Sequence, residues 1–226
     1  MVSANQVKKD SDQLLFDALP KVAVLAFKKC SEMDFFSQDN WYLAGGTALA
    51  LQSGHRRSYD LDFFTENKFF DESKIEKNLN DKGEWITNSI SNGTIYGVFS
   101  GTKMSLISYP YFKPAEKMYN FGTVSLLSPL DIAVMKIIAI SQRGKKRDFF
   151  DLYWICQNVE SLHNNISKVH KQYSINQNLT HILKSLVYFI DAETDPDPEI
   201  YFKATWQVVK NFFKKEIPMI VKKIIK

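Results

Sequence analysis

The sequence predicts an α+β protein with a mixed sheet in its first half and helices alone in its second half. Two observations indicate this division. Segments whose apolar residues alternate with period two lie before residue 127, and two of them, 94–100 and 102–108, are joined by a glycine turn typical of a hairpin. From Ser128 onward, apolar residues recur at helical spacing instead. We therefore expect two domains, 1–127 and 128–226.

The first half is expected to begin with helices. Apolar residues recur at helical spacing from Asp10 to Ser31, and Pro20 is expected to interrupt them because its ring cannot continue a helix. A short apolar strand at 41–44 then ends in a pair of glycines typical of a tight turn, and residues 47–52 suit a short helix.

The rest of the first half supplies the sheet. Residues 60–64 alternate as a strand does, residues 71–82 have helical spacing, and residues 85–90 form a further strand before the hairpin. Because side chains two positions apart on a strand point to the same side, Asp60 and Asp62 are expected to lie together.

The second half opens with a helix-start signal, Ser128-Pro129-Leu130-Asp131, in which a capping residue, a proline and an acid follow in order. Helices are expected at 129–143, 148–159, 179–190 and 199–216, the last after an acidic, proline-rich linker at 195–198.

The composition is that of an ordinary globular protein, with 226 residues of which 45% are apolar and 24% charged. No segment approaches the roughly 20 apolar residues that span a bilayer, so no membrane association is expected. The two cysteines lack the second pair that a zinc site needs and suit buried thiols in a reducing cytoplasm. Residues 203–226 contain seven lysines and one acid, which would suit a partner with phosphates, although such a lysine-rich helix face is more often ordinary solvated surface.

Asp60 and Asp62 are candidate metal ligands. Two carboxylates on one side of a strand can bind the same divalent cation, and hard oxygen ligands select Mg²⁺, which takes substrate phosphates as further ligands. A metal held in this way can activate a hydroxyl that attacks a triphosphate. Taken alone, an Asp-x-Asp pair is more often an ordinary surface feature.

Gly45, Gly46 and Thr47 are candidate phosphate-binding residues. Glycines let the backbone approach a phosphate closely, and the N-terminus of the following helix supplies unpaired N–H donors and the positive end of its dipole. A double glycine is also a common turn, so this motif gains weight only from the aspartates that follow it.

Taken together, three short motifs, Gly45-Gly46-Thr47, Gly54-His55-Arg56-Arg57-Ser58 and Asp60-Leu61-Asp62, resemble the first motif of the AbiEii/AbiGii toxin nucleotidyltransferases. That family belongs to the polymerase-β-like nucleotidyltransferase superfamily and includes toxins of bacterial toxin–antitoxin and abortive-infection systems. The resemblance implies a polymerase-β-like domain followed by a helical domain, Mg²⁺ or Mn²⁺ as cofactor, a nucleoside triphosphate (NTP) as substrate, and a cognate antitoxin.

Arg56 and Arg57 lie between the glycine turn and the aspartates, where guanidinium groups could hold a triphosphate. A surface loop is the alternative. Lys136, in turn, is a cation on an otherwise apolar helix face, where it either extends to solvent or reaches an acidic or phosphate group. Lys136-Ile137-Ile138-Ala139-Ile140 resembles the family's second motif, which implies nucleotide binding by this lysine.

The segment Arg147-Asp148-Phe149-Phe150-Asp151-Leu152 resembles the family's third motif, which makes Asp148 a candidate catalytic carboxylate. Asp151 is expected to anchor Arg147 or a lysine. One departure concerns the sheet: enzymes of this superfamily usually carry a third carboxylate on a central strand, yet residues 94–113 contain no acid and Ser105 stands at the equivalent position.

The leading hypothesis is metal-dependent transfer of a nucleotidyl group from an NTP to RNA, such as a tRNA 3′ end, by a toxin. The missing strand carboxylate motivates one alternative, a catalytically silent nucleotide- or partner-binding protein of the same fold. The other alternative keeps the chemistry and transfers the group to protein side chains.

Overall fold

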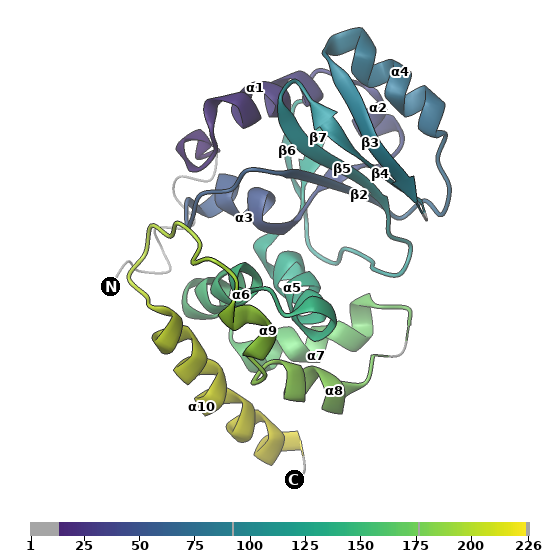
Figure 1. The fold of residues 1–226 in the computed structure, drawn as a ribbon. Helices are drawn as coiled ribbons and strands as arrows, with labels where there is room; N and C mark the ends of the chain where they lie inside the picture. Colours follow the sequence, from purple (N-terminus) through teal and green to yellow (C-terminus); the bar gives the residue numbers. More distant parts are fainter. Residues whose placement is uncertain (1–13, 92, 176, 225–226) are drawn as a thin grey trace. The chain divides into compact units, whose positions relative to one another are not determined.

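The computed structural model describes residues 14–91, 93–175 and 177–224 (Figure 1). They form two compact units, 14–128 and 129–224, which we call the sheet unit and the helical unit. The helical spacing noted at residues 10–13, and the last lysine of the basic C-terminal stretch, lie outside these ranges.

The sheet unit is built on a seven-stranded sheet in the order β3-β4-β5-β2-β1-β7-β6. Its strands are β1 (Tyr42–Leu43), β2 (Leu61–Thr65), β3 (Trp85–Ser91), β4 (Thr94–Phe99), β5 (Thr102–Ser108), β6 (Tyr119–Phe121) and β7 (Val124–Leu126). The pairs β1–β7 and β2–β5 are parallel, whereas the other four neighbouring pairs are antiparallel. The predicted mixed sheet in an α+β fold is thus confirmed.

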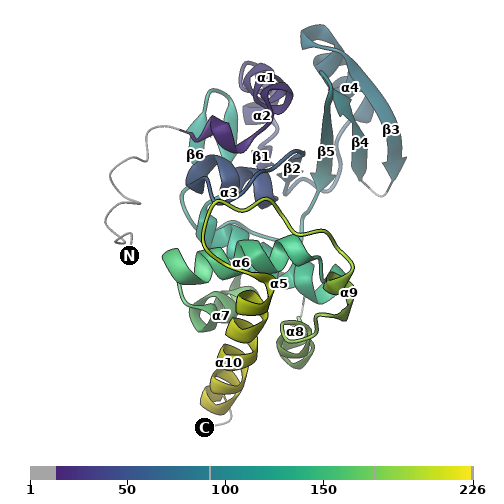
Figure 2. The ribbon, with the colours of Figure 1, turned by 60° about the vertical axis from the view of Figure 1, so that its left-hand side comes forward.

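Short helices pack around this sheet (Figures 1 and 2). They are the 3-10 helix η1 (Phe16–Ala18) and the α-helices α1 (Lys21–Cys30), α2 (Phe35–Gln38), α3 (Gly45–Ser53) and α4 (Glu72–Lys82). Pro20 caps the start of α1, because its fixed φ suits a helix start and not a helix interior. Helix α1 contacts β5, α2 contacts β7, α3 contacts β2 and α4 contacts β3.

Two hairpins in this unit depend on left-handed turn residues. Ser100 and Gly101, with φ of 47° and 81°, join β4 to β5 as predicted. The β6–β7 hairpin was not anticipated from the sequence, because both strands are only three residues long. Its turn residue Gly122 has φ of 57°, and a Cβ there would lie 2.2 Å from the carbonyl oxygen of Ser31.

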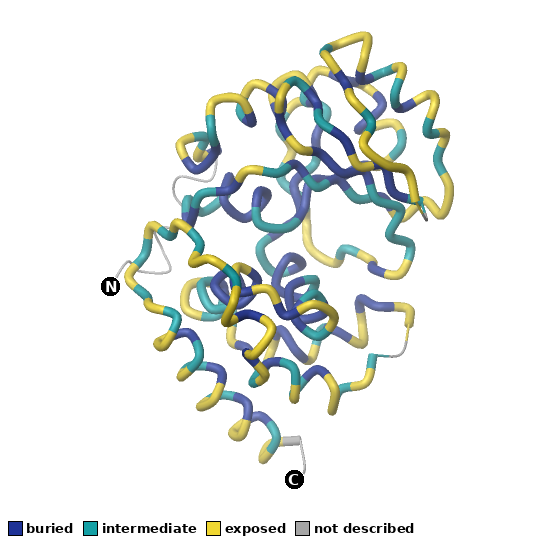
Figure 3. The backbone as a smooth tube through the Cα atoms, viewed as in Figure 1, coloured by how far each residue is buried: buried dark blue, intermediate teal, exposed yellow. Residues whose placement is uncertain are grey.

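The helical unit is arranged around α5 (Pro129–Arg143), which contacts α6 (Lys146–Asn158), α7 (Leu162–Gln172) and α8 (Leu179–Ser185). The short α9 (Ile190–Glu193) and the long α10 (Trp206–Ile224) complete it, and α10 packs on α6. Figure 3 shows α5 as a mostly buried element. None of the helices in the described ranges has the length and apolar character that crossing a bilayer requires.

The last helix differs from the sequence expectation of 199–216. It begins at Trp206 and continues through Pro218, although proline removes one hydrogen bond from a helix interior. Its buried side chains recur every three to four residues on both sides of that proline: Val209, Phe213, Ile217 and Ile220. Burial of this apolar stripe keeps the helix continuous past Pro218.

Candidate active site

The glycine turn at the start of α3 has the geometry that its sequence suggested. Ala44 is extended and Gly45 has φ of 65°, a conformation that residues other than glycine rarely adopt. Helix α3 begins at Gly45, so the N–H groups of its first turn have no acceptors within the helix. They form a cluster of donors at the positive end of the helix dipole.

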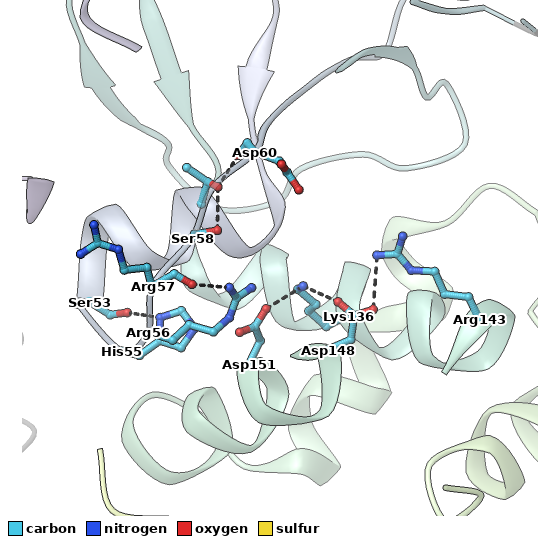
Figure 4. Close-up of polar contacts among 11 residues, drawn as sticks. Ser53, His55, Arg56, Arg57, Ser58, Asp60, Lys136, Arg143, Asp148 and Asp151 are labelled. Atoms are coloured by element: carbon cyan, nitrogen blue, oxygen red, sulfur yellow. Dashed lines mark hydrogen bonds and ion pairs between the residues drawn. The ribbon is translucent and has the colours of Figure 1, made fainter. Parts of the chain in front are cut away.

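Gly46 provides room for a guanidinium group. A Cβ at this position would lie 1.9 Å from Nη2 of Arg56, so the arginine packs directly on the glycine. The side chain of Arg56 is buried, and its Nη1 donates a hydrogen bond of 2.8 Å to the carbonyl oxygen of Arg57 (Figure 4). The structure therefore brings Arg56, one of the sequence candidates, against the glycine turn.

The Thr47 hydroxyl is engaged inside the protein. It donates to the backbone carbonyl of Asp60 and lies 2.8 Å from the hydroxyl of Ser58, which must therefore act as the donor between the two. Thr47 and Ser58 are both buried. These bonds tie the start of α3 to the chain entering β2, so Thr47 positions Asp60. Because the hydroxyl is engaged, Thr47 contributes only its backbone N–H to the donor cluster at the helix start.

Asp62 lies between the glycine turn and the neighbouring strand. In the parallel β2–β5 ladder it is paired with Ser105, whose hydroxyl donates to Oδ1 of Asp62. Its other oxygen, Oδ2, would lie 3.8 Å from a Cβ added to Gly45. The Ser105 hydroxyl thus orients the Asp62 carboxylate, and it does so from the position where the sequence resemblance led us to expect a third acid.

The half-buried carboxylates of Asp60 and Asp62 and the hydroxyl of Ser105 are hard oxygen donors of the kind that Mg²⁺ prefers. Asp60 stands one residue before β2 and its carboxylate points away from Ser58 (Figure 4). In the part of the chain that the structure describes, no group of three or more acids, histidines or cysteines forms a complete metal cage. The residues present fit a cation that takes its remaining ligands from substrate and water.

The loop between α3 and β2 also holds His55 and Arg57. His55 is buried, and its Nδ1 lies 3.1 Å from the hydroxyl of Ser53. Arg57 donates a long bond of 3.4 Å to the carbonyl oxygen of Asp17 and is half-buried. The guanidinium of Arg57, unlike that of Arg56, is therefore placed against the N-terminal segment of the unit.

In the helical unit, Lys136 forms an ion-pair cluster with two buried aspartates. Its Nζ lies 2.5 Å from Oδ1 of Asp148 and 2.7 Å from Oδ2 of Asp151 (Figure 4). The side chain of Lys136 is only 6% exposed, and both carboxylates are fully buried. The lysine on an apolar face thus reaches acidic groups, and Asp151 anchors a lysine as expected.

Asp148 retains binding capacity on one oxygen. Its Oδ2 is buried and, within the described residues, makes no hydrogen bond, although the guanidinium of Arg143 approaches it to 3.3 Å. A buried carboxylate oxygen without a hydrogen bond is costly, because it has lost its hydration. This oxygen is therefore the one in the cluster that a ligand would satisfy.

Ser58 was not recognised from the sequence. Its role depends on the geometry of a loop, and no spacing rule links it to Thr47. The buried hydrogen bond of 2.5 Å from Gln172 Nε2 to Asp131 Oδ1 was also missed, because its partners are 41 residues apart.

Comparisons with known proteins agree with this architecture. Residues 31–96 and 99–219 match the family model described as nucleotidyl transferase AbiEii toxin of type IV toxin–antitoxin systems. The uncharacterized protein aq_aa25 of Aquifex aeolicus is 35% identical over 184 residues, which cover 79% of this chain and 87% of that protein.

Two solved structures share the fold. One is MenT4, the nucleotidyltransferase toxin Rv2826c of Mycobacterium tuberculosis, with a TM-score of 0.53, 11% identity and coverage of 98% of this chain and 90% of that one. The other is an H. pylori protein assigned as a nucleotidyltransferase, with a TM-score of 0.51, 15% identity and coverage of 90% and 96%. The sequence resemblance noted at the glycine turn is confirmed by the family match. The chain is a nucleotidyltransferase and belongs to the AbiEii toxin family.

Proposed function

We propose that this protein transfers a nucleotidyl group from an NTP to the 3′ end of an RNA such as tRNA, with Mg²⁺ bound by Asp60 and Asp62. The observation that carries the proposal is the position of Asp62, whose two carboxylate oxygens face the Ser105 hydroxyl and the Gly45 turn. The proposed metal ligands and the proposed phosphate donors therefore belong to the same unit.

Asp60 and Asp62 would hold the cation, and Mn²⁺ would fit the same oxygen ligands. When bound, the metal neutralises charge on the triphosphate and activates the attacking hydroxyl. Ser105 contributes by fixing Oδ1 of Asp62 through its hydrogen bond, which leaves Oδ2 directed at the glycine turn. Thr47 contributes by holding the backbone of Asp60.

The first-turn N–H groups of α3, at Gly45, Gly46 and Thr47, would bind the triphosphate together with Arg56. The Arg56 guanidinium is buried against Gly46, so it is already oriented before substrate arrives. A preformed cationic group of this kind stabilises the negative charge that leaves with pyrophosphate. Arg57 is proposed to add a further positive charge.

Lys136 and Asp148 are proposed to act in catalysis as well. In the transfer, the acceptor hydroxyl oxygen bonds to the α-phosphorus, the bond to the β-phosphate breaks, and pyrophosphate leaves. Oδ2 of Asp148 would accept the proton of the acceptor hydroxyl, since this oxygen has no hydrogen bond among the described residues. Lys136 would position the Asp148 carboxylate through its ion pair, and its contribution to nucleotide binding is part of the same proposal.

The test is a labelling assay with each of the four NTPs in radiolabelled form, Mg²⁺ and total tRNA. Wild-type protein is expected to label RNA, whereas Asp60→Ala and Asp62→Ala are expected to lose the activity by a factor of roughly 10³ or more. Asp81→Ala, which changes an exposed aspartate on α4, serves as the matched control. Labelling by Asp60→Ala at the wild-type rate would refute the metal assignment.

Two further measurements distinguish this proposal from the two alternative hypotheses, a protein acceptor and a catalytically silent binding protein. Label that appears in protein from a cell extract, and not in RNA, would identify a protein acceptor. Binding of NTP in calorimetry without transfer to any acceptor would favour a catalytically silent binding protein. This alternative is motivated by Ser105, which stands on β5 beside Asp62 where a third carboxylate was expected.

A further inference from the structure

The turn between α5 and α6 carries an unusual density of positive charge. Four of the five residues from 143 to 147 are basic, and Gly144, with φ of 54°, makes the sharp turn between them. A pocket of about 290 Å³ opens here, and its lining contains three cations and one acid: Arg143, Lys145, Arg147, Asp195 and Pro196. All of these residues belong to the helical unit.

Lys146 is the basic residue of this turn that does not line the pocket. Its side chain is 7% exposed, its Nζ lies 3.0 Å from Oδ1 of Asp197, and it packs over the ring of Trp206. This lysine therefore fixes the segment before α10 to the start of α6. Arg143, Lys145 and Arg147, by contrast, are exposed.

The pocket already holds one oxyanion of the protein itself. Asp195 accepts 2.9 Å from the backbone N–H of Lys146, at the start of α6, and its other oxygen lies 3.1 Å from Nζ of Lys145. Burial by itself would raise the pKa of the Asp195 carboxyl, yet these two donors lower it below its ordinary value. The donors at this turn thus stabilise a negatively charged group.

The pocket is lined by two arginines, Arg143 and Arg147, in addition to the lysine that pairs with Asp195. The side chain of Arg143 is 53% exposed, and its Nη2 is 3.3 Å from Oδ2 of Asp148, the carboxylate proposed to act in catalysis. A guanidinium has five N–H donors, so one ion pair leaves most of the Arg143 donors available. The lining residues carry a net charge of two positive units, three basic minus one acidic.

We propose that this pocket binds a phosphate group of the RNA acceptor. The inference rests on the proposed function, which places the NTP phosphates at the start of α3. Exposed lysine and arginine side chains around an open pocket suit a backbone phosphate, which is recognised by charge and not by base identity. The contact between Arg143 and Asp148 then links phosphate binding to the carboxylate that handles the acceptor hydroxyl.

The test uses Arg147→Gln and the double variant Lys145→Gln/Arg147→Gln, both of which leave the residues of the Arg143–Asp148 ion pair unchanged. The control is Lys171→Gln/Lys184→Gln, which removes the same charge from exposed positions on α7 and α8. RNA affinity is measured across a salt series, together with KM for RNA and for NTP. Arg147→Gln keeps the Lys145–Asp195 pair, so it reports on binding even where the double variant loses stability.

The double variant is expected to raise KM for RNA about tenfold and to flatten the slope of log K against log salt by roughly one, because each phosphate contact contributes about 0.7 to 0.9. KM for NTP should stay unchanged. A salt slope equal to that of the control would overturn the inference, and so would an equal rise in KM for NTP, which would assign the pocket to the triphosphate. Wild-type protein that neither binds nor labels RNA would instead overturn the proposed acceptor, and this inference with it.

Discussion

At the scale of single residues, the closest packing in the candidate site is that of Arg56 on Gly46. Replacing Gly46 with alanine would place a Cβ 1.9 Å from Nη2 of Arg56 and displace the guanidinium, which is the end of a flexible side chain. The fold should therefore survive, while KM for NTP rises about tenfold, or roughly 1.4 kcal/mol.

Steady-state kinetics on Gly46→Ala, Arg56→Ala and the double variant measure this effect. Because both single changes remove the same oriented guanidinium, their effects should not add. Additive losses would show that Gly46 acts independently of Arg56.

Lys136 gives a prediction about stability. Lys136→Met would leave Asp148 and Asp151 buried without their shared cation, at a cost of about 3–5 kcal/mol in the free energy of unfolding. Changing both aspartates to asparagine in the same protein should recover much of this loss, because the uncompensated charges are then gone. Urea denaturation compares the three proteins, and equal stability of wild type and Lys136→Met would contradict the cluster.

The sequence predicts candidate site residues but not the partners of their side chains. Asp60, Asp62 and Gly45 are candidates because spacing along a strand and a turn is a local property. The engagement of the Thr47 hydroxyl with Asp60, and of Lys136 with two aspartates, depends on how separate elements pack. Such contacts between elements are not encoded in any short pattern.

At the scale of elements, the start of α6 depends on a distant side chain. The Asp195 carboxylate accepts from the N–H of Lys146, 49 positions away, and acts as a cap from outside the helix. Asp195 and Asp197 together hold the linker before α10 against Lys145 and Lys146.

Asp195→Asn should lower the free energy of unfolding at pH 7 by ~1 kcal/mol. The pKa of Asp195 is lower in the folded protein than the ordinary value of 3.8, so its contribution is fully present above that value and is lost as pH falls through the lowered pKa. The difference between wild type and variant should therefore shrink below pH 3.8. Denaturation curves at pH 7 and pH 3 test this, with Asp81→Asn as control, and a difference that grows on acidification would disprove it.

Elements with strong patterns were predicted well. Helix α5 and strand β5 have the predicted bounds, because a cap with proline and a glycine turn mark their ends. The short β6–β7 hairpin and helix α7 were missed. For the hairpin, three-residue strands are too short to show a period, whereas α7 has ordinary helical spacing and a serine cap that could have been recognised.

At the scale of the whole molecule, membership of a toxin family predicts an effect on cells. Induced expression in a bacterial host is expected to arrest growth, and Asp62→Ala should abolish the arrest while the protein accumulates to the same level. Co-expression of a cognate antitoxin should restore growth. Growth curves, with immunoblots of the wild-type protein and of Asp62→Ala, measure this effect. Normal growth with abundant wild-type protein would argue against toxicity.

The fold class was predictable at this scale because a change from strand to helical periodicity divides the sequence once. The acceptor was not, since a surface that binds RNA is assembled from side chains on several elements. For the basic turn at 143–147, proposed to contact RNA, the charge is visible in the sequence, but the pocket and the Lys145–Asp195 pair are seen only in the folded chain.

The presence of Ser105 affects how much negative charge the protein places at the proposed metal site beside β2. With a hydroxyl at position 105, the acids of the proposed metal site are Asp60, one residue before β2, and Asp62 within it, and one divalent ion would balance their two negative charges. A second cation would then have to be accompanied by the triphosphate's own negative charges. Under the proposed function, the strand site without substrate would therefore hold a single divalent ion, and a second ion would enter together with the triphosphate.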